Sequence, residues 1–208
     1  MLKCLAAIAL LVSPAAAGPD QPLVGQWESV ERTPGGVGEF IEFRADGTAR
    51  QISAAMGDAT YKLDGEWLLT FWKDRESGKT SALANRVEIE GYDLVQKDEQ
   101  GNLVSRLQRV GSPVRSSAVE GVWCSEDGPG LTTFTEFTAG GDMFIRLPIR
   151  VLLGRYWLSG DQLAVELAES TRKEFQFQVK DDLLTVTPAG GAPRQFRRAR
   201  SSVLRTLP

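Results

Sequence analysis

Histidine is absent from this 208-residue chain, and cysteine occurs at only two positions. Without histidine the chain cannot build Ser-His-Asp or Cys-His catalytic sites, imidazole acid–base chemistry or histidine-ligated metal sites. Long apolar runs are also missing, because no stretch approaches the ~20 residues that a membrane-spanning helix requires. The formal net charge of −3 gives no reason to expect a nucleic-acid partner.

The first 17 residues have the pattern of an export signal. Lys3 supplies the positive charge, Leu5 to Val12 is apolar, and the alanines at 15–17 fit a cleavage site that leaves Gly18 as the first residue. We therefore expect a signal peptide over residues 1–17 and a periplasmic or secreted protein. Cys4 precedes the apolar run, whereas a lipoprotein cysteine follows it, so no lipid anchor is expected.

Removal of this leader leaves Cys124 as the only cysteine. An intramolecular disulfide and a thiolate zinc site are then both excluded. Cys124 follows Trp123 on an expected strand, so the two side chains point to opposite faces. If the indole is inside, the thiol should be partly accessible from outside.

Three short motifs occur twice, about 95 residues apart, which predicts a tandem duplication of one β-rich unit. The paired segments are 25–27 with 121–123, 40–47 with 134–141, and 61–68 with 156–163. The expected organisation is a first unit over 18–110, a linker over 111–118, a second unit over 119–200 and a flexible tail over 201–208. The linker is Ser-rich and contains Pro113.

Short strands separated by turn signals fill both units. Asp46-Gly47 and Asp64-Gly65 are hairpin signals, because a type I′ turn needs positive φ at both central residues. The small residues from Ala54 to Ala59 suggest a connection between strands. No window has the apolar spacing of an amphipathic helix. The pattern predicts an all-β antiparallel protein.

Each unit resembles a small lipocalin-like domain in its Gly-x-Trp motif and in an arginine near its last strand. The residues that carry the resemblance are Gly25, Trp27 and Arg109, and Gly121, Trp123 and Arg198. It implies two tandem small antiparallel lipocalin-like barrels related by duplication, each closed at one end by an arginine over an indole. Whether the halves form separate barrels or one larger closed sheet stays open.

The strand over residues 67–72 differs between the copies. Leu68, Thr70 and Trp72 align with Leu163, Val165 and Leu167, which gives a mostly apolar face in both units that should face the core. The opposite face carries three apolar side chains, which we call the aromatic stripe: Trp67, Leu69 and Phe71. The matching positions of the second unit are Gln162, Ala164 and Glu166. Because aromatic residues are enriched at interfaces, the stripe is a candidate contact surface for a ligand or a partner.

Two further features have competing interpretations. Glu42 and Glu136 occupy equivalent positions and could be catalytic carboxylates, but a strand residue facing solvent or bonded to a turn is the favoured interpretation. The arginine-rich stretch at 194–205 could touch an anionic membrane surface. We favour a solvated edge strand with charges that oppose aggregation.

These observations favour a non-catalytic exported binding protein without a metal or cofactor, whose partner is a small apolar ligand or an envelope protein. The alternatives are a structural or inhibitory module acting through the aromatic stripe, and an enzyme that uses carboxylates. A cavity of ~300 Å³ or more inside a barrel would favour a small ligand. Filled barrels with an exposed aromatic patch would favour a protein partner.

Overall fold

The computed structural model describes residues 22–75, 77–111, 118–126, 128, 130–168 and 170–203. The predicted signal peptide and most of the predicted linker lie outside these residues. Within them the chain forms fourteen strands and no α-helix, which confirms the all-β prediction. The strands are β1 (Gly25–Ser29), β2 (Val37–Phe43), β3 (Thr48–Asp64), β4 (Trp67–Lys73), β5 (Thr80–Glu90), β6 (Asp93–Lys97), β7 (Leu103–Arg109), β8 (Gly121–Glu126), β9 (Thr132–Phe137), β10 (Asp142–Ser159), β11 (Gln162–Leu167), β12 (Lys173–Lys180), β13 (Leu183–Pro188) and β14 (Arg194–Arg198).

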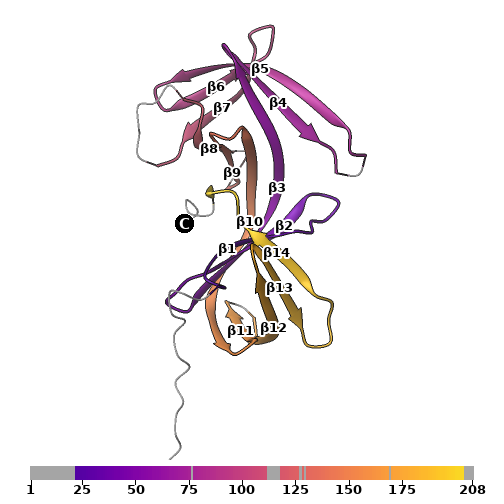
Figure 1. Cartoon of the computed structure of the whole chain (residues 1–208). Coiled ribbons are helices and arrows are strands. Elements are labelled where there is room, and N and C mark those ends of the chain that lie inside the picture. The colour runs from indigo at the N-terminus through magenta and orange to yellow at the C-terminus, as the bar shows by residue number, and fades with distance from the viewer. Residues whose placement is uncertain are drawn as a thin grey trace, which may run out of the picture.

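The strands pair into one closed antiparallel ring in chain order, and β14 closes it by pairing with β1. An additional pairing joins the two longest strands, β3 and β10, across the ring. This pairing divides the ring into two circuits, which appear as two lobes (Figure 1). The lower lobe contains β1, β2, β11, β12, β13 and β14, the upper lobe contains β4 to β9, and β3 and β10 run through both.

Both sequence halves therefore contribute strands to each lobe. The lower lobe takes β1 and β2 from the first half and β11 to β14 from the second half. The larger closed sheet, which the sequence left open, is the observed arrangement. Each long strand runs from one lobe into the other. The boundary between the lobes therefore does not fall at the predicted linker.

The expected connection over Ala54 to Ala59 is wrong, because these residues lie in the middle of β3. Small side chains here allow close packing against neighbouring strands. A Cβ added at Gly57 would lie 3.1 Å from the ring of Trp72. The composition that suggested a break in the strand instead lets β3 run past a bulky neighbour.

Side chains pack the inside of each lobe. In the lower lobe Trp27, Phe43 and Tyr156 belong to one buried cluster together with Leu163 and Phe196. The corresponding upper cluster contains the following residues: Ala59, Leu68, Leu94, Leu107, Val119, Trp123, Phe137 and Met143. Each lobe core therefore combines residues from both halves of the sequence.

An arginine lies over the buried indole in each lobe. The guanidinium carbon of Arg198 is 3.9 Å from the ring centroid of Trp27, and that of Arg109 is 4.1 Å from that of Trp123. Each arginine thus covers the indole of the other half, whereas the family resemblance implied stacking within one unit. The exchange follows from the ring, in which β14 pairs with β1 and β7 pairs with β8. Such a stack contributes ~0.5–2 kcal/mol.

The glycine of each Gly-x-Trp motif makes room for this arginine. Gly121 has φ of 127°, and a Cβ at this position would lie 2.8 Å from Nη1 of Arg109. Gly25 has φ of 129° and meets Arg198 in the same way. The motif therefore combines a backbone conformation that side chains disfavour with direct contact to a guanidinium.

A third buried cluster, the junction cluster, lies on the outer faces of strands where the lobes meet. Its buried members are Phe40, Ile52, Ala54, Met56, Phe134 and Val203, and Val110, Val122, Cys124 and Ala199 pack against them. Val203 and Ser201 are 0% and 2% exposed, so the start of the predicted flexible tail is instead packed against the protein. The remaining tail residues, 204–208, lie outside the described residues.

Candidate functional site

The aromatic stripe lies on the outer face of β4. Leu68 and Thr70 point into the upper lobe and are 1% and 5% exposed. Trp67, Leu69 and Phe71 alternate with them and are each partly exposed. The stripe thus occupies the face that the sequence predicted. Its neighbours in register include Lys62 and Thr60 on β3 and Arg86, Ala84 and Ala82 on β5.

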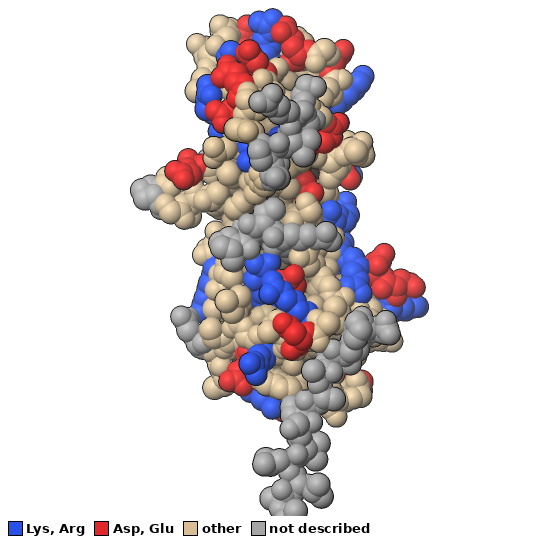
Figure 2. Space-filling view, turned by 90° about the vertical axis from the view of Figure 1, so that its left-hand side faces the viewer, with Lys and Arg blue, Asp and Glu red and all other residues tan. Residues whose placement is uncertain are grey.

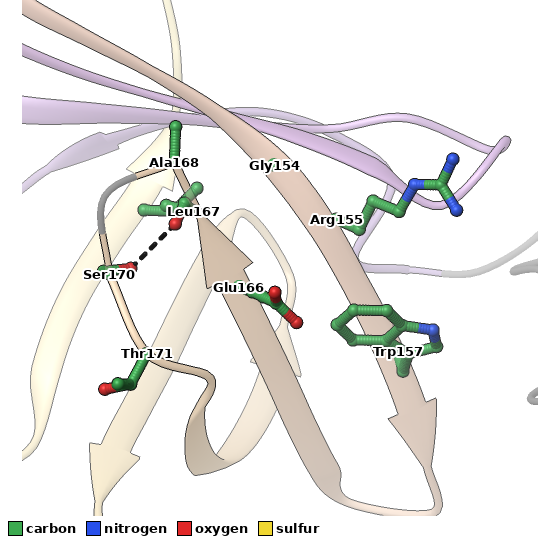
Figure 3. Close-up of a pocket in the computed structure, with 8 residues that line it drawn as sticks. All are labelled: Gly154, Arg155, Trp157, Glu166, Leu167, Ala168, Ser170 and Thr171. Atoms are coloured by element: carbon green, nitrogen blue, oxygen red, sulfur yellow. Dashed lines mark hydrogen bonds between the residues drawn. The ribbon is translucent and has the colours of Figure 1, made fainter.

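The lower lobe carries its own outer aromatic residue, which the comparison of the two copies missed. Trp157 on β10 pairs with Ala164 on β11 and helps line an open pocket of about 630 Å³ (Figure 3). Glu166 points from β11 toward the space beside this indole, as Figure 3 shows. The guanidinium carbon of Arg172 is 5.0 Å from the Trp157 ring centroid. The sequence feature that could have predicted this site is Trp157 itself, which directly follows Tyr156 of the repeated motif.

The two carboxylates that suggested an enzyme have structural partners. Glu42 accepts a hydrogen bond from Arg44 at 2.9 Å and lies 3.2 Å from a guanidinium nitrogen of Arg50. Glu136, on β9, accepts hydrogen bonds of 2.6–2.7 Å from Ser201 Oγ, Ser202 N and Ser202 Oγ. Glu136 is buried and therefore does not face solvent as the favoured interpretation allowed; it holds Ser201 and Ser202 across the junction.

The arginines after position 193 do not form a solvated edge strand, because β14 pairs with β13 on one side and with β1 on the other. Arg194 contacts Glu39 at 2.7 Å, and Arg198 covers Trp27. Arg197 contacts Glu28 at 2.7 Å. Arg205 lies outside the described residues. The sequence showed a charged stretch, but its partners come from strands far away in the chain.

Arg197 and Arg200 belong to a charged group between the lobes, which we call the arginine cluster. It consists of two carboxylates, Glu28 and Asp58, and five arginines: Arg32, Arg75, Arg146, Arg197 and Arg200. Glu28 is 0% exposed, and the side chains of Arg32 and Arg146 are each 1% exposed. The Arg146 and Arg32 guanidiniums outweigh the burial of Asp58 and lower the pKa of its carboxyl.

No local sequence motif predicts the arginine cluster. Its members come from β1, the β1–β2 loop, β3, the β4–β5 loop, β10 and the end of β14. Figure 2 shows basic side chains gathered on the lower lobe next to the place where the lobes meet. A group assembled from six separate segments becomes visible only when strand pairing is known.

Cys124 is a free thiol with intermediate exposure. Its strand neighbour Trp123 is buried inside the upper lobe, and the thiol packs against the junction cluster on the outer side, as the alternation of the strand predicted. Burial, and to a lesser extent the charge of Glu126, raises the pKa of this thiol. Cys124 packs against the same cluster that contains the buried Val203, so we expect residues 199–203 to restrict access to the sulfur.

We expect Ser201→Ala/Ser202→Ala to accelerate labelling of Cys124 by a thiol reagent at pH 7 about tenfold or more. The double change removes two hydrogen bonds to Glu136, and a bond to a charged group contributes ~1.5–3 kcal/mol. Labelling followed by mass spectrometry measures the rate, with Ser170→Ala as the control because that hydroxyl bonds elsewhere. Equal rates in all three proteins would contradict the role of the segment.

The described residues contain no group of three or more Asp, Glu, Cys or His side chains placed to hold a metal ion. A membrane-crossing helix is likewise not found among them. The chain matches no family model, no curated protein and no solved structure. Its function therefore has to be inferred from the geometry of its own residues.

Proposed function

We propose that this chain is a non-catalytic exported binding protein that engages another envelope protein through the aromatic stripe on β4. In this proposal the two lobes are lipocalin-like barrels that arose by internal duplication and exchanged strands. The equivalent arginine–tryptophan stacks support that origin, as do the hydroxyls of Tyr61 and Tyr156, which donate at 2.7 and 2.8 Å to Thr138 O and Arg44 O.

The observation that carries the proposal is the division of β4 into two faces. Leu68 contributes to the core, while Trp67 and Phe71 remain partly exposed on the outer side. Large aromatic side chains are enriched at the buried centres of protein interfaces. The lobe interiors are occupied by their own side chains, so an outer surface is the better candidate for recognition.

The test begins with native mass spectrometry of the protein purified from its own periplasm, which identifies any bound polypeptide. Trp67→Ser/Phe71→Ser should reduce the recovery of that polypeptide at least tenfold, because a hot-spot aromatic at the centre of an interface contributes about 2 kcal/mol or more. The matched control is Gln162→Ser/Glu166→Ser at the equivalent positions of β11. Circular dichroism should show the same β content in all three proteins. Undiminished recovery with the stripe variant would refute the proposal.

A small apolar ligand is the second candidate, and the pocket beside Trp157 favours it. Its lining includes Leu167 and Ala168 together with this indole. The same mass spectra distinguish the two candidates, because a retained small molecule that is lost in Trp157→Ser points to the lower lobe. A polypeptide lost only in the stripe variant points to β4.

A further inference from the structure

The arginine cluster holds more positive charge than its carboxylates neutralise. Among the described residues, five guanidiniums each lie within 4.0 Å of one or both of two carboxylates, which leaves a net charge of +3. The chain as a whole has a formal net charge of −3. This local excess of positive charge therefore runs against the overall balance of the protein.

The hydrogen-bond donors around Oδ2 of Asp58 also outnumber the lone pairs of this oxygen. Oδ2 of Asp58 lies 2.7 Å from Arg32 Nη2 and 3.4, 3.6 and 4.0 Å from Nη2 of Arg200, Arg197 and Arg75. One carboxylate oxygen offers about two lone-pair positions, so it cannot accept from all four groups. Among the described residues, Nε of Arg32, Nε of Arg146 and Oδ1 of Asp58 are buried without a hydrogen-bond partner. More guanidinium donors therefore surround Oδ2 of Asp58 than this oxygen can accept from.

The surplus donors lie on the accessible side of the cluster. The side chains of Arg197, Arg200 and Arg75 are 36%, 46% and 53% exposed, whereas Arg32 and Arg146 are buried behind them. Glu28 is fully buried and contacts Arg197 at 2.7 Å, so it fixes the position of this guanidinium. Three guanidiniums from two segments, the β4–β5 loop and the end of β14, therefore converge on one oxygen at the surface, above a buried charged layer.

We propose that the arginine cluster is a binding site for a phosphate group, carried either by a free small molecule or by a lipid headgroup. A guanidinium fork matches a phosphate oxygen pair in geometry, and charge-assisted bidentate bonds of this kind are among the strongest in proteins. A phosphate monoester brings about 1.5–2 negative charges at pH 7 and three acceptor oxygens, and so offsets much of the excess charge and the donor excess at Asp58. The site uses none of the residues of the aromatic stripe and is independent of the function proposed for it.

The experiment is isothermal titration of the full protein with inorganic phosphate, against sodium chloride of equal ionic strength. We expect saturable binding of one phosphate, weakened at least tenfold in Arg197→Gln/Arg200→Gln and severalfold in Arg75→Gln. Matched controls are Arg86→Gln and Arg172→Gln, whose guanidiniums lie over Trp67 and Trp157 away from the cluster. These controls should bind phosphate as the unmodified protein does.

Vesicles distinguish the two sources of phosphate. Sedimentation with phosphatidylcholine vesicles that contain phosphatidic acid, and release by free phosphate, would identify a lipid headgroup as the ligand. Phosphate binding without sedimentation would identify a free phosphorylated molecule. Arg75 and Arg200 are about half exposed, so their single variants decide the matter if the Arg197 variant does not fold. Absence of saturable phosphate binding, or equal binding by cluster and control variants, would overturn the proposal.

Discussion

Expressed separately, residues 18–110 and 119–208 should each fail to fold as a stable monomer, while co-expression should restore the folded protein. Three pairings join the halves: β1 with β14, β3 with β10, and β7 with β8. A lone first half keeps Trp27 and Phe43 but loses Tyr156 and Phe196 from the same core. Each lost large apolar side chain removes ~1.5–3 kcal/mol of burial, and several such losses exceed the ~5–15 kcal/mol stability of a typical domain.

Size-exclusion chromatography and circular dichroism measure this outcome for each half alone and for the pair. A full-length chain cleaved at a protease site within residues 112–117 is the control, because it keeps both halves while breaking their covalent link. It should elute and unfold like the intact protein. A folded, monomeric 18–110 fragment would show that each half closes its own barrel, which is the organisation that the sequence repeats alone suggested.

Glu28→Gln should destabilise the folded protein by ~3–5 kcal/mol, the second large effect that we expect. The carboxylate is 0% exposed and contacts Arg197 at 2.7 Å and Arg146 at 3.4 Å. Removing its charge leaves the buried Arg146 guanidinium with Asp58 as its remaining anionic contact within the described part of the chain. Breaking a buried ion pair on one side is costly, because the other charge stays desolvated.

Urea unfolding followed by tryptophan fluorescence measures this loss. Glu66→Gln is the matched control: its carboxylate pairs with Arg86 on the exposed surface, where such a pair contributes ~0–1 kcal/mol. The double variant Glu28→Gln/Arg146→Met should recover part of the lost stability, because it also removes the buried guanidinium that has lost the charge of Glu28. If Glu28→Gln and Glu66→Gln unfold at the same urea concentration, the buried layer does not support the arginine cluster.

Local patterns predicted the parts of the candidate sites that lie on one strand. The alternation along β4 placed Leu68 inside and Trp67 outside because side chains of a strand change faces at every residue. The same rule placed Cys124 on the side opposite to Trp123. The arginine cluster was missed, because its members come from strands and loops that only pairing brings together. The pocket beside Trp157 lies on the single hairpin of β10 and β11, and it was missed because the comparison of the copies covered β11 but not Trp157 on β10.

The sequence by itself determined the all-β class, the repeated Gly-x-Trp motifs and the two faces of individual strands, since period-two alternation and turn residues act over a few neighbours. Only the tertiary structure decided that β3 and β10 cross between the lobes and that each arginine stacks on the indole of the other half. The reason is that strand pairing joins backbone groups of any sequence at any separation. The choice between pairing within a half and pairing across halves therefore rests on the packing of the whole ring.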